Sequence, residues 1–107
     1  MLDAEWRPRA ASACLTGNAQ IALFLLALHA RHADERLLRV AVRAIDLVKR
    51  SQLMHVRAPD LRGAIPGSAP IWGSYIRGAC PNWAAKFLID ALLHKGEALS
   101  RASAPVA

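Results

Sequence analysis

A long interruption of the helical pattern limits what this chain can fold into. Residues 53–81 hold eight glycines and prolines, too many for a continuous helix or a regular strand: Pro59, Gly63, Pro66, Gly67, Pro70, Gly73, Gly78 and Pro81. The same segment contains Ile65, Trp72 and Tyr75, whose side chains need a surface to pack on. Long loops in compact domains are usually functional or disordered, and these apolar side chains favour an ordered, functional loop.

Two helices are predicted before this loop. The first spans about residues 18–32 and opens with Thr16 or Asn18 as its N-cap. Between Ile21 and Leu28 it is apolar on every side, which is typical of a helix surrounded by protein.

The second predicted helix spans about residues 35–51, with Asp34 as its N-cap and Glu35 in its first turn. Its charged residues recur every three or four positions and form one polar stripe, whereas the opposite side is apolar. This helix is therefore predicted to be amphipathic. Because only a few residues connect the two helices, we expect them to form an antiparallel hairpin.

A third helix is predicted over about residues 82–95. Asn82 caps it directly after a proline, and Gly96 is a stop signal at its end. Residues 1–15 and 100–107 are predicted to be loose. The expected fold is one all-α domain, in which an antiparallel helical hairpin is joined by a third helix after a long ordered loop.

Composition indicates that the chain needs a partner. At 107 residues it is long enough for one domain with a modest core. Hydrophobic residues make up 54% of the chain and charged residues 21%, which indicates a globular protein with more apolar side chains than so small a core can hide. The expected partners are a second copy of the chain or further helical hairpins of a larger protein.

Several locations and partners are not favoured. The longest apolar run, from Ile21 to Leu28, is about half of the roughly 17 residues that a membrane-spanning helix needs. Acidic residues near the N-terminus do not fit a secretory signal, and Cys14 and Cys80 form neither a disulfide framework nor a C-x-x-C motif. We therefore predict no membrane span and a cytoplasmic location.

The net charge of +6 comes mainly from arginines. They are spread from Arg7 to Arg101, with no alternation of basic and aromatic residues and no recognition-helix motif, so a nucleic-acid partner is not favoured. Anion binding by Arg39, Arg43 and Arg50 on one side of the second helix remains an alternative, and such binding would weaken steeply with salt.

Three motifs resemble a known superfold. They are "TGNAQIA" (16–22), "GAIPGSAPIWGSY" (63–75) and "PNWAAKFLIDALL" (81–93). Together with the residues around them, about 14–95, they resemble the C-terminal part of bacterial α/α-toroid proteins. This superfold is shared by six-hairpin glycosidases, terpenoid cyclases and protein prenyltransferases.

The resemblance implies that the first and third predicted helices are inner helices of a barrel and the second an outer one. A closed toroid needs more helices than this chain contains. The resemblance therefore implies part of a toroid, which is not expected to catalyse a reaction alone.

The loop and the start of the third helix hold the candidate ligand-binding residues Trp72, Tyr75, Arg77, Asn82, Trp83 and Lys86. The resemblance implies a carbohydrate or isoprenoid ligand, and aromatic side chains supply the flat faces that stack on sugar rings. The alternative is that Trp72 and Tyr75 only attach the loop to the helices beneath it.

Lys86, Asp90 and His94 recur at a spacing of four and share one face of the third helix. Asp90 is the candidate catalytic acid or base. The alternative is a solvated stripe with a weak ion pair. No partner carboxylate of the kind that glycoside hydrolysis requires is evident. His29 and His32 are interpreted as surface groups, and neither a metal site nor a cofactor is predicted.

Three functional hypotheses follow from the sequence. The first is part of an α/α toroid related to carbohydrate or cell-surface polysaccharide metabolism. The second is a helical interaction module that acts as a homodimer. The third is a basic protein that binds anions or nucleic acid.

Overall fold

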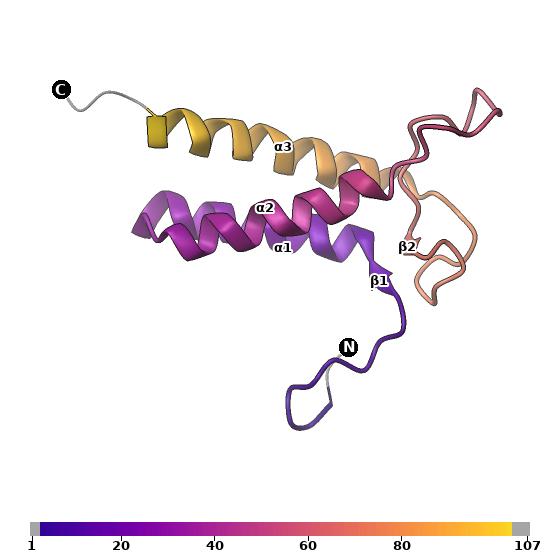
Figure 1. Cartoon of the computed structure of the whole chain (residues 1–107), viewed down its shortest axis with the longest axis horizontal. Helices are drawn as coiled ribbons and strands as arrows, with labels where there is room; N and C mark the ends of the chain where they lie inside the picture. The colour runs from indigo at the N-terminus through magenta and orange to yellow at the C-terminus, as the bar shows by residue number, and fades with distance from the viewer. Residues whose placement is uncertain (1–2, 104–107) are drawn as a thin grey trace.

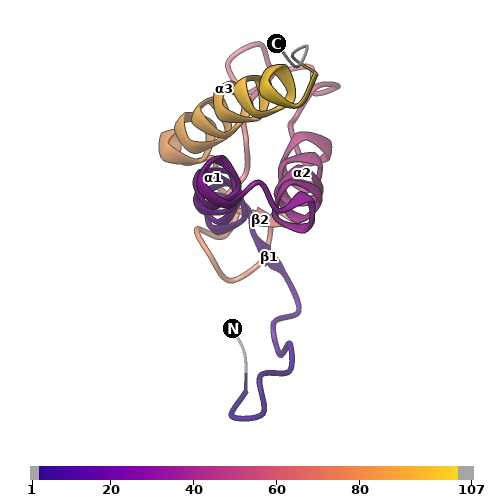
Figure 2. The same cartoon turned by 90° about the vertical axis from the view of Figure 1, so that its left-hand side faces the viewer.

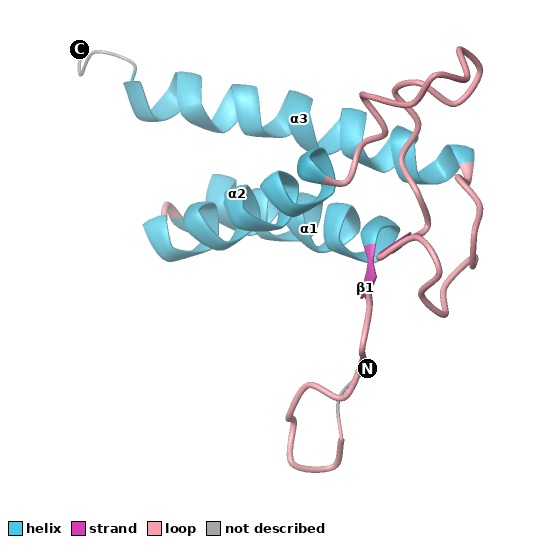
Figure 3. Cartoon of the chain, turned by 45° about the vertical axis from the view of Figure 1, so that its right-hand side comes forward, coloured by secondary structure: helices cyan, strands magenta, loops and turns pink. Residues whose placement is uncertain are grey.

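Three α-helices and one pair of very short strands make up the structure, a computed structural model that describes residues 3–103 (Figure 1). The elements in chain order are β1 (Ala13–Cys14), α1 (Leu15–His32), α2 (Glu35–Arg50), β2 (Ser68–Ala69) and α3 (Asn82–Ser103). Figure 3 distinguishes these helices and strands from the long loop between α2 and α3.

The predicted all-α arrangement is confirmed. α1 and α2 form an antiparallel hairpin, and α3 packs mainly on α1 while running in the same direction as α1 (Figure 1). The end-on view shows α1 and α2 side by side with α3 crossing over them (Figure 2). α1 is therefore the central helix of the three.

The core lies where these helices touch. Six of its residues are fully buried alanines, which let the helix backbones approach closely: Ala19, Ala22, Ala41, Ala84, Ala91 and Ala98. Larger side chains fill the remaining space, among them Leu15, Leu26, Ile45 and Val48. The apolar side of α2 lies in this core, as its amphipathic pattern predicts.

Two helix ends differ from the sequence prediction. α1 begins at Leu15 rather than near residue 18, because the β1 pairing keeps the chain extended up to Cys14. The Cys14 sulfur accepts the N–H of Gly17 at 3.3 Å and is the N-cap, whereas the side chain of Asn18 donates to the Cys14 carbonyl at 2.8 Å. α3 continues past Gly96, which is exposed within the helix, and ends at Ser103.

The prediction that α1 is surrounded by protein is wrong for the part of the chain described. Ile21 is 56% exposed and Phe24 62% exposed, because α2 and α3 cover only one side of α1. Within residues 3–103, no helix is long and apolar enough to span a membrane.

Asp34 is the N-cap of α2, as predicted. Its carboxylate accepts the backbone N–H of Arg36 at 2.9 Å, and the Arg36 guanidinium donates to it at 2.8 and 3.2 Å. The Arg36 side chain is the main cause of the low pKa of Asp34, which lies at about 2 against an ordinary 3.8. Folding thus favours the ionised carboxylate.

This low pKa predicts a loss of stability in acid. The contribution of Asp34 is fully present above the ordinary pKa of 3.8 and disappears as the pH falls towards 2, where the folded-state carboxylate also binds a proton. Asp34→Asn keeps a capping oxygen but has no charge to titrate. We expect the difference in melting temperature between wild type and Asp34→Asn to shrink as the pH falls from 5 to 2, measured by circular dichroism. A difference that is constant over this range would contradict the prediction.

Candidate functional site

The long loop is held against the start of α1. β2 pairs antiparallel with β1, which places Cys14 opposite Ser68. The N–H of Leu15 donates to the Gly67 carbonyl at 3.0 Å. The loop is therefore ordered, as predicted, whereas residues 13–14 are paired rather than loose.

Ser68 is the central contact within the loop. Its hydroxyl accepts the N–H of Tyr75 at 3.1 Å and donates to the carbonyl of Tyr75 at 2.6 Å. The phenol oxygen of Tyr75 accepts the indole N–H of Trp83 at 3.0 Å. Tyr75 is thus attached to β2 through its backbone and to α3 through its ring, which agrees with the structural role proposed for it as an alternative.

Gly73 brings the loop into close contact with the N-terminal segment. A Cβ atom at this position would lie 2.5 Å from the Cβ of Ser12 and 2.6 Å from the Cβ of Ser68. Only glycine permits this approach without displacing its neighbours. The turn is also closed by the N–H of Gly73, which donates to the Pro70 carbonyl at 2.9 Å.

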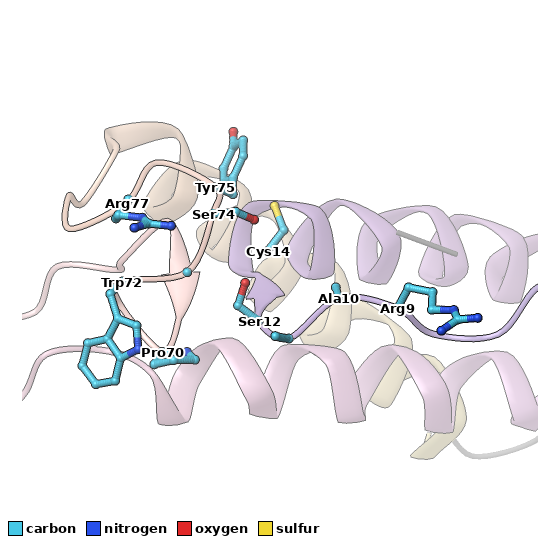
Figure 4. A pocket seen from close by; sticks show the side chains of 11 residues that line it. Arg9, Ala10, Ser12, Cys14, Pro70, Trp72, Ser74, Tyr75 and Arg77 are labelled. Carbon is cyan, nitrogen blue, oxygen red and sulfur yellow. The ribbon is translucent and has the colours of Figure 1, made fainter. Parts of the chain in front are cut away.

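A cleft of about 510 Å³ lies between this turn and the N-terminal segment. Its lining residues are Arg9, Ala10, Ala11, Ser12, Cys14, Pro70, Trp72, Gly73, Ser74, Tyr75 and Arg77. In Figure 4, Trp72 and Arg77 lie at one end of the cleft, and Ser12, Ser74 and Cys14 lie nearer its middle. Trp72 is 68% exposed, so its indole does little to attach the loop to the helices.

The two arginines of the cleft differ in their partners. The Nε of Arg9 donates to the Asp3 carboxylate at 3.0 Å, and Figure 4 shows the Arg9 side chain far from Trp72. Arg77 has no ion-pair partner among residues 3–103. The end of the cleft next to Trp72 therefore carries an uncompensated positive charge.

The other predicted ligand residues lie on α3. Asn82, Trp83 and Lys86 line a shallow depression on this helix, together with Asp90. The six candidates therefore form two groups, which are joined by the hydrogen bond between Trp83 and Tyr75.

Asp90 has the surroundings of a surface ion pair. Its carboxylate lies 2.6 Å from the Lys86 ammonium one turn earlier, and His94 lies 3.7 Å from Glu97. Both pairs are partly or largely exposed on α3. This arrangement matches the solvated stripe that we gave as the alternative to a catalytic face.

The histidines of α1 do not share a site. The interpretation of His29 as a surface group is wrong: its side chain is buried, and its Nε2 lies 3.7 Å from the Glu35 carboxylate at the start of α2. His32 is exposed at the helix end. Within the described residues, no group of three or more side chains is arranged to hold a metal ion.

Sequence reasoning missed the contribution of the N-terminal segment. Ser12 and Cys14 line the cleft and precede the quoted motifs, whereas Ser68 holds its rim and lies within "GAIPGSAPIWGSY" without having been singled out. Two-residue strands are too short to show alternation, so the pairing that places these residues leaves no periodic signal in the sequence.

Comparisons with protein-family models, with curated proteins and with solved structures find no match for this chain. The resemblance to α/α-toroid proteins therefore stays a prediction.

Proposed function

We propose that this protein binds an acidic carbohydrate in the cleft between residues 9–14 and 70–77. The observation that carries the proposal is that one cleft is lined both by Trp72, which is exposed, and by Arg77, which has no ion-pair partner in the described chain. The turn that presents this indole is held by the hydrogen bonds of Ser68 to Tyr75 and by the close approach at Gly73.

The two side chains supply complementary interactions. An indole offers a flat apolar face of the kind that stacks on the C–H bonds of a sugar ring. A guanidinium donates paired hydrogen bonds to a carboxylate or phosphate. The hydroxyls of Ser12 and Ser74 provide further donors and acceptors for sugar hydroxyls.

The order of the turn favours binding further. Ser68 and Gly73 hold the backbone on both sides of Trp72, so little conformational freedom is lost when a ligand arrives. Ligand binding is supported in this way without movement of the helices.

The proposed activity is binding rather than hydrolysis. Glycoside hydrolysis ordinarily uses two carboxylic acids around the scissile bond. The residues that line the cleft in the described chain include no Asp or Glu, and Asp90 lies on α3 in a pair with Lys86. A catalytic carboxylate would have to come from further hairpins, as in the α/α toroid that the sequence resembles. The parallel course of α1 and α3, with the charged side of α2 facing out, supports that wider architecture.

The test is a binding titration with D-glucuronate, using D-glucose as the neutral control. We expect glucuronate to bind at least about tenfold more tightly than glucose, because only glucuronate pairs with Arg77. Added salt should weaken this binding. Isothermal titration calorimetry gives both affinities on the intact chain.

Matched variants assign the binding to the cleft. Arg77→Gln is expected to remove the preference for glucuronate, whereas Arg43→Gln removes the same charge from the outer side of α2 and should leave it unchanged. Trp72→Ala is expected to weaken both sugars. Equal binding of glucuronate and glucose, binding of inorganic phosphate alone, or an equal effect of both arginine variants would overturn the proposal.

A further inference from the structure

Residues 53–64 form a loop that projects away from the helices where α2 ends (Figures 1 and 3). The two ends of this projecting loop are joined. The N–H of Leu53 donates to the Ala64 carbonyl at 2.9 Å, and the N–H of Gly63 donates to the Leu53 carbonyl at 2.7 Å. Arg62 closes the tip, since its guanidinium donates to two backbone carbonyls at 3.3 Å. The shape of the loop is therefore fixed by its own hydrogen bonds.

The projecting loop presents apolar side chains to solvent. Met54 is 53% exposed and Leu61 is 45% exposed. Neither side chain belongs to the core, to the cleft or to the depression on α3. Exposed apolar groups that protrude from a protein in this way are typical of contact sites for proteins or membranes.

Positive charge is concentrated around the same loop. Together, α2 and the projecting loop contain seven Lys or Arg and three Asp or Glu, so residues 35–64 carry +4 of the formal net charge of +6. Among these seven cations, only Arg36 has an ion-pair partner in the described chain. The loop itself contains one carboxylate, that of Asp60. Four exposed cations lie at the end of α2 or in the loop: Lys49, Arg50, Arg57 and Arg62.

Other exposed apolar side chains lack such an excess of charge. Residues 15–30 of α1 expose Ile21 and Phe24 but contain no Lys or Arg. On α3, two carboxylates offset three cations. Trp6 lies within residues 3–9, where two arginines pair with two carboxylates. In the described chain, only the projecting loop combines exposed apolar side chains with several unpaired cations.

We propose that the projecting loop and the end of α2 dock on an anionic membrane surface. Met54 and Leu61 enter the boundary between headgroups and acyl chains, while the four exposed cations lie among the anionic headgroups. Apolar burial and attraction to anionic lipids act together in this kind of interfacial binding. A nucleic acid would use the charge alone, because residues 35–64 contain no Phe, Trp or Tyr on which bases could stack.

The membrane surface and the carbohydrate cleft are independent. None of the four cations and neither apolar side chain of the docking surface lines the cleft. Loss of vesicle binding would therefore leave glucuronate binding intact, and the two proposals can fail separately.

Vesicle binding tests the proposal on the intact chain. Co-sedimentation is measured with vesicles of phosphatidylcholine alone and with vesicles that also contain about 30% phosphatidylserine. We expect the partition coefficient to be at least about tenfold higher on the anionic vesicles, because each Lys or Arg close to the surface contributes about fivefold.

Matched variants locate the contact. Arg57→Gln is expected to lower partition onto anionic vesicles by about three- to fivefold, and Leu61→Ser by at least about threefold. Arg31→Gln and Phe24→Ser make the same changes at exposed positions of α1 and should have no effect. The length of α2, about 24 Å, separates Arg31 from the loop and exceeds the Debye length of about 8 Å. Circular dichroism checks that all four variants keep their helices.

Four results would overturn membrane docking. Equal partition onto neutral and anionic vesicles would remove the role of charge. Wild-type binding by Leu61→Ser would remove the role of apolar insertion. Equal effects of the α1 variants and the loop variants would place the contact elsewhere. Displacement of the chain from anionic vesicles by a short DNA duplex at equal phosphate concentration would favour a nucleic acid instead.

Discussion

Replacing Leu26 with alanine is expected to lower the melting temperature by about 10 to 20 °C. Leu26 is 2% exposed on α1, the helix that packs against both α2 and α3. Truncation of a buried leucine costs about 2–5 kcal/mol, since apolar burial is lost and a cavity is left behind. Domains of this size are stabilised by only about 5–15 kcal/mol, so this change removes a large share. Thermal unfolding followed by circular dichroism measures the effect.

Val40→Ala is the matched control. Val40 is exposed on α2 and lies outside the core, so its truncation should change the unfolding free energy by less than about 0.5 kcal/mol. If Leu26→Ala and Val40→Ala had equal effects, α1 would not be the central helix of the fold. A melt of Leu26→Ala that loses cooperativity as well as stability would agree with that central position.

The helical hairpin could be predicted from local patterns. Asp34 and the alternating faces of α2 act within a few residues of chain, and the structure follows them closely. The start of α1 could not be placed, because it depends on Cys14 pairing with Ser68, far away in the sequence. The sequence pattern places the end of α3 too early. An exposed glycine such as Gly96 lowers helix stability by only about 1 kcal/mol and does not by itself end a helix.

The cleft was predictable only in part. Trp72, Tyr75 and Arg77 stood out as unusual residues in a loop, and they do lie at one cavity. Their different roles depend on contacts made in three dimensions: the backbone of Tyr75 is bonded to Ser68, whereas the indole of Trp72 is left in solvent. Sequence alone cannot separate an aromatic that supports a loop from one that the loop presents.

The second large expected effect concerns Ser68, a residue that does not line the cleft. Ser68→Ala is expected to abolish glucuronate binding and to lower the free energy of unfolding by about 1–3 kcal/mol. Ser68 is 1% exposed, and its hydroxyl is bonded to both the N–H and the carbonyl of Tyr75. Alanine leaves these backbone groups without that partner, so the turn that carries Trp72 loses its support.

Ser74→Ala provides the comparison for stability, because Ser74 is exposed and its hydroxyl faces the cleft rather than the interior. It should change the unfolding free energy by less than about 0.5 kcal/mol. Calorimetry with D-glucuronate and thermal unfolding are measured on both variants. If Ser68→Ala bound glucuronate as the wild type does, the order of the turn would not matter for binding, and the exposed Trp72 would need another explanation. Suppose instead that Ser68→Ala loses glucuronate binding while its helices still melt cooperatively. The cleft would then owe its shape to the hydrogen bonds of Ser68 rather than to the helical core.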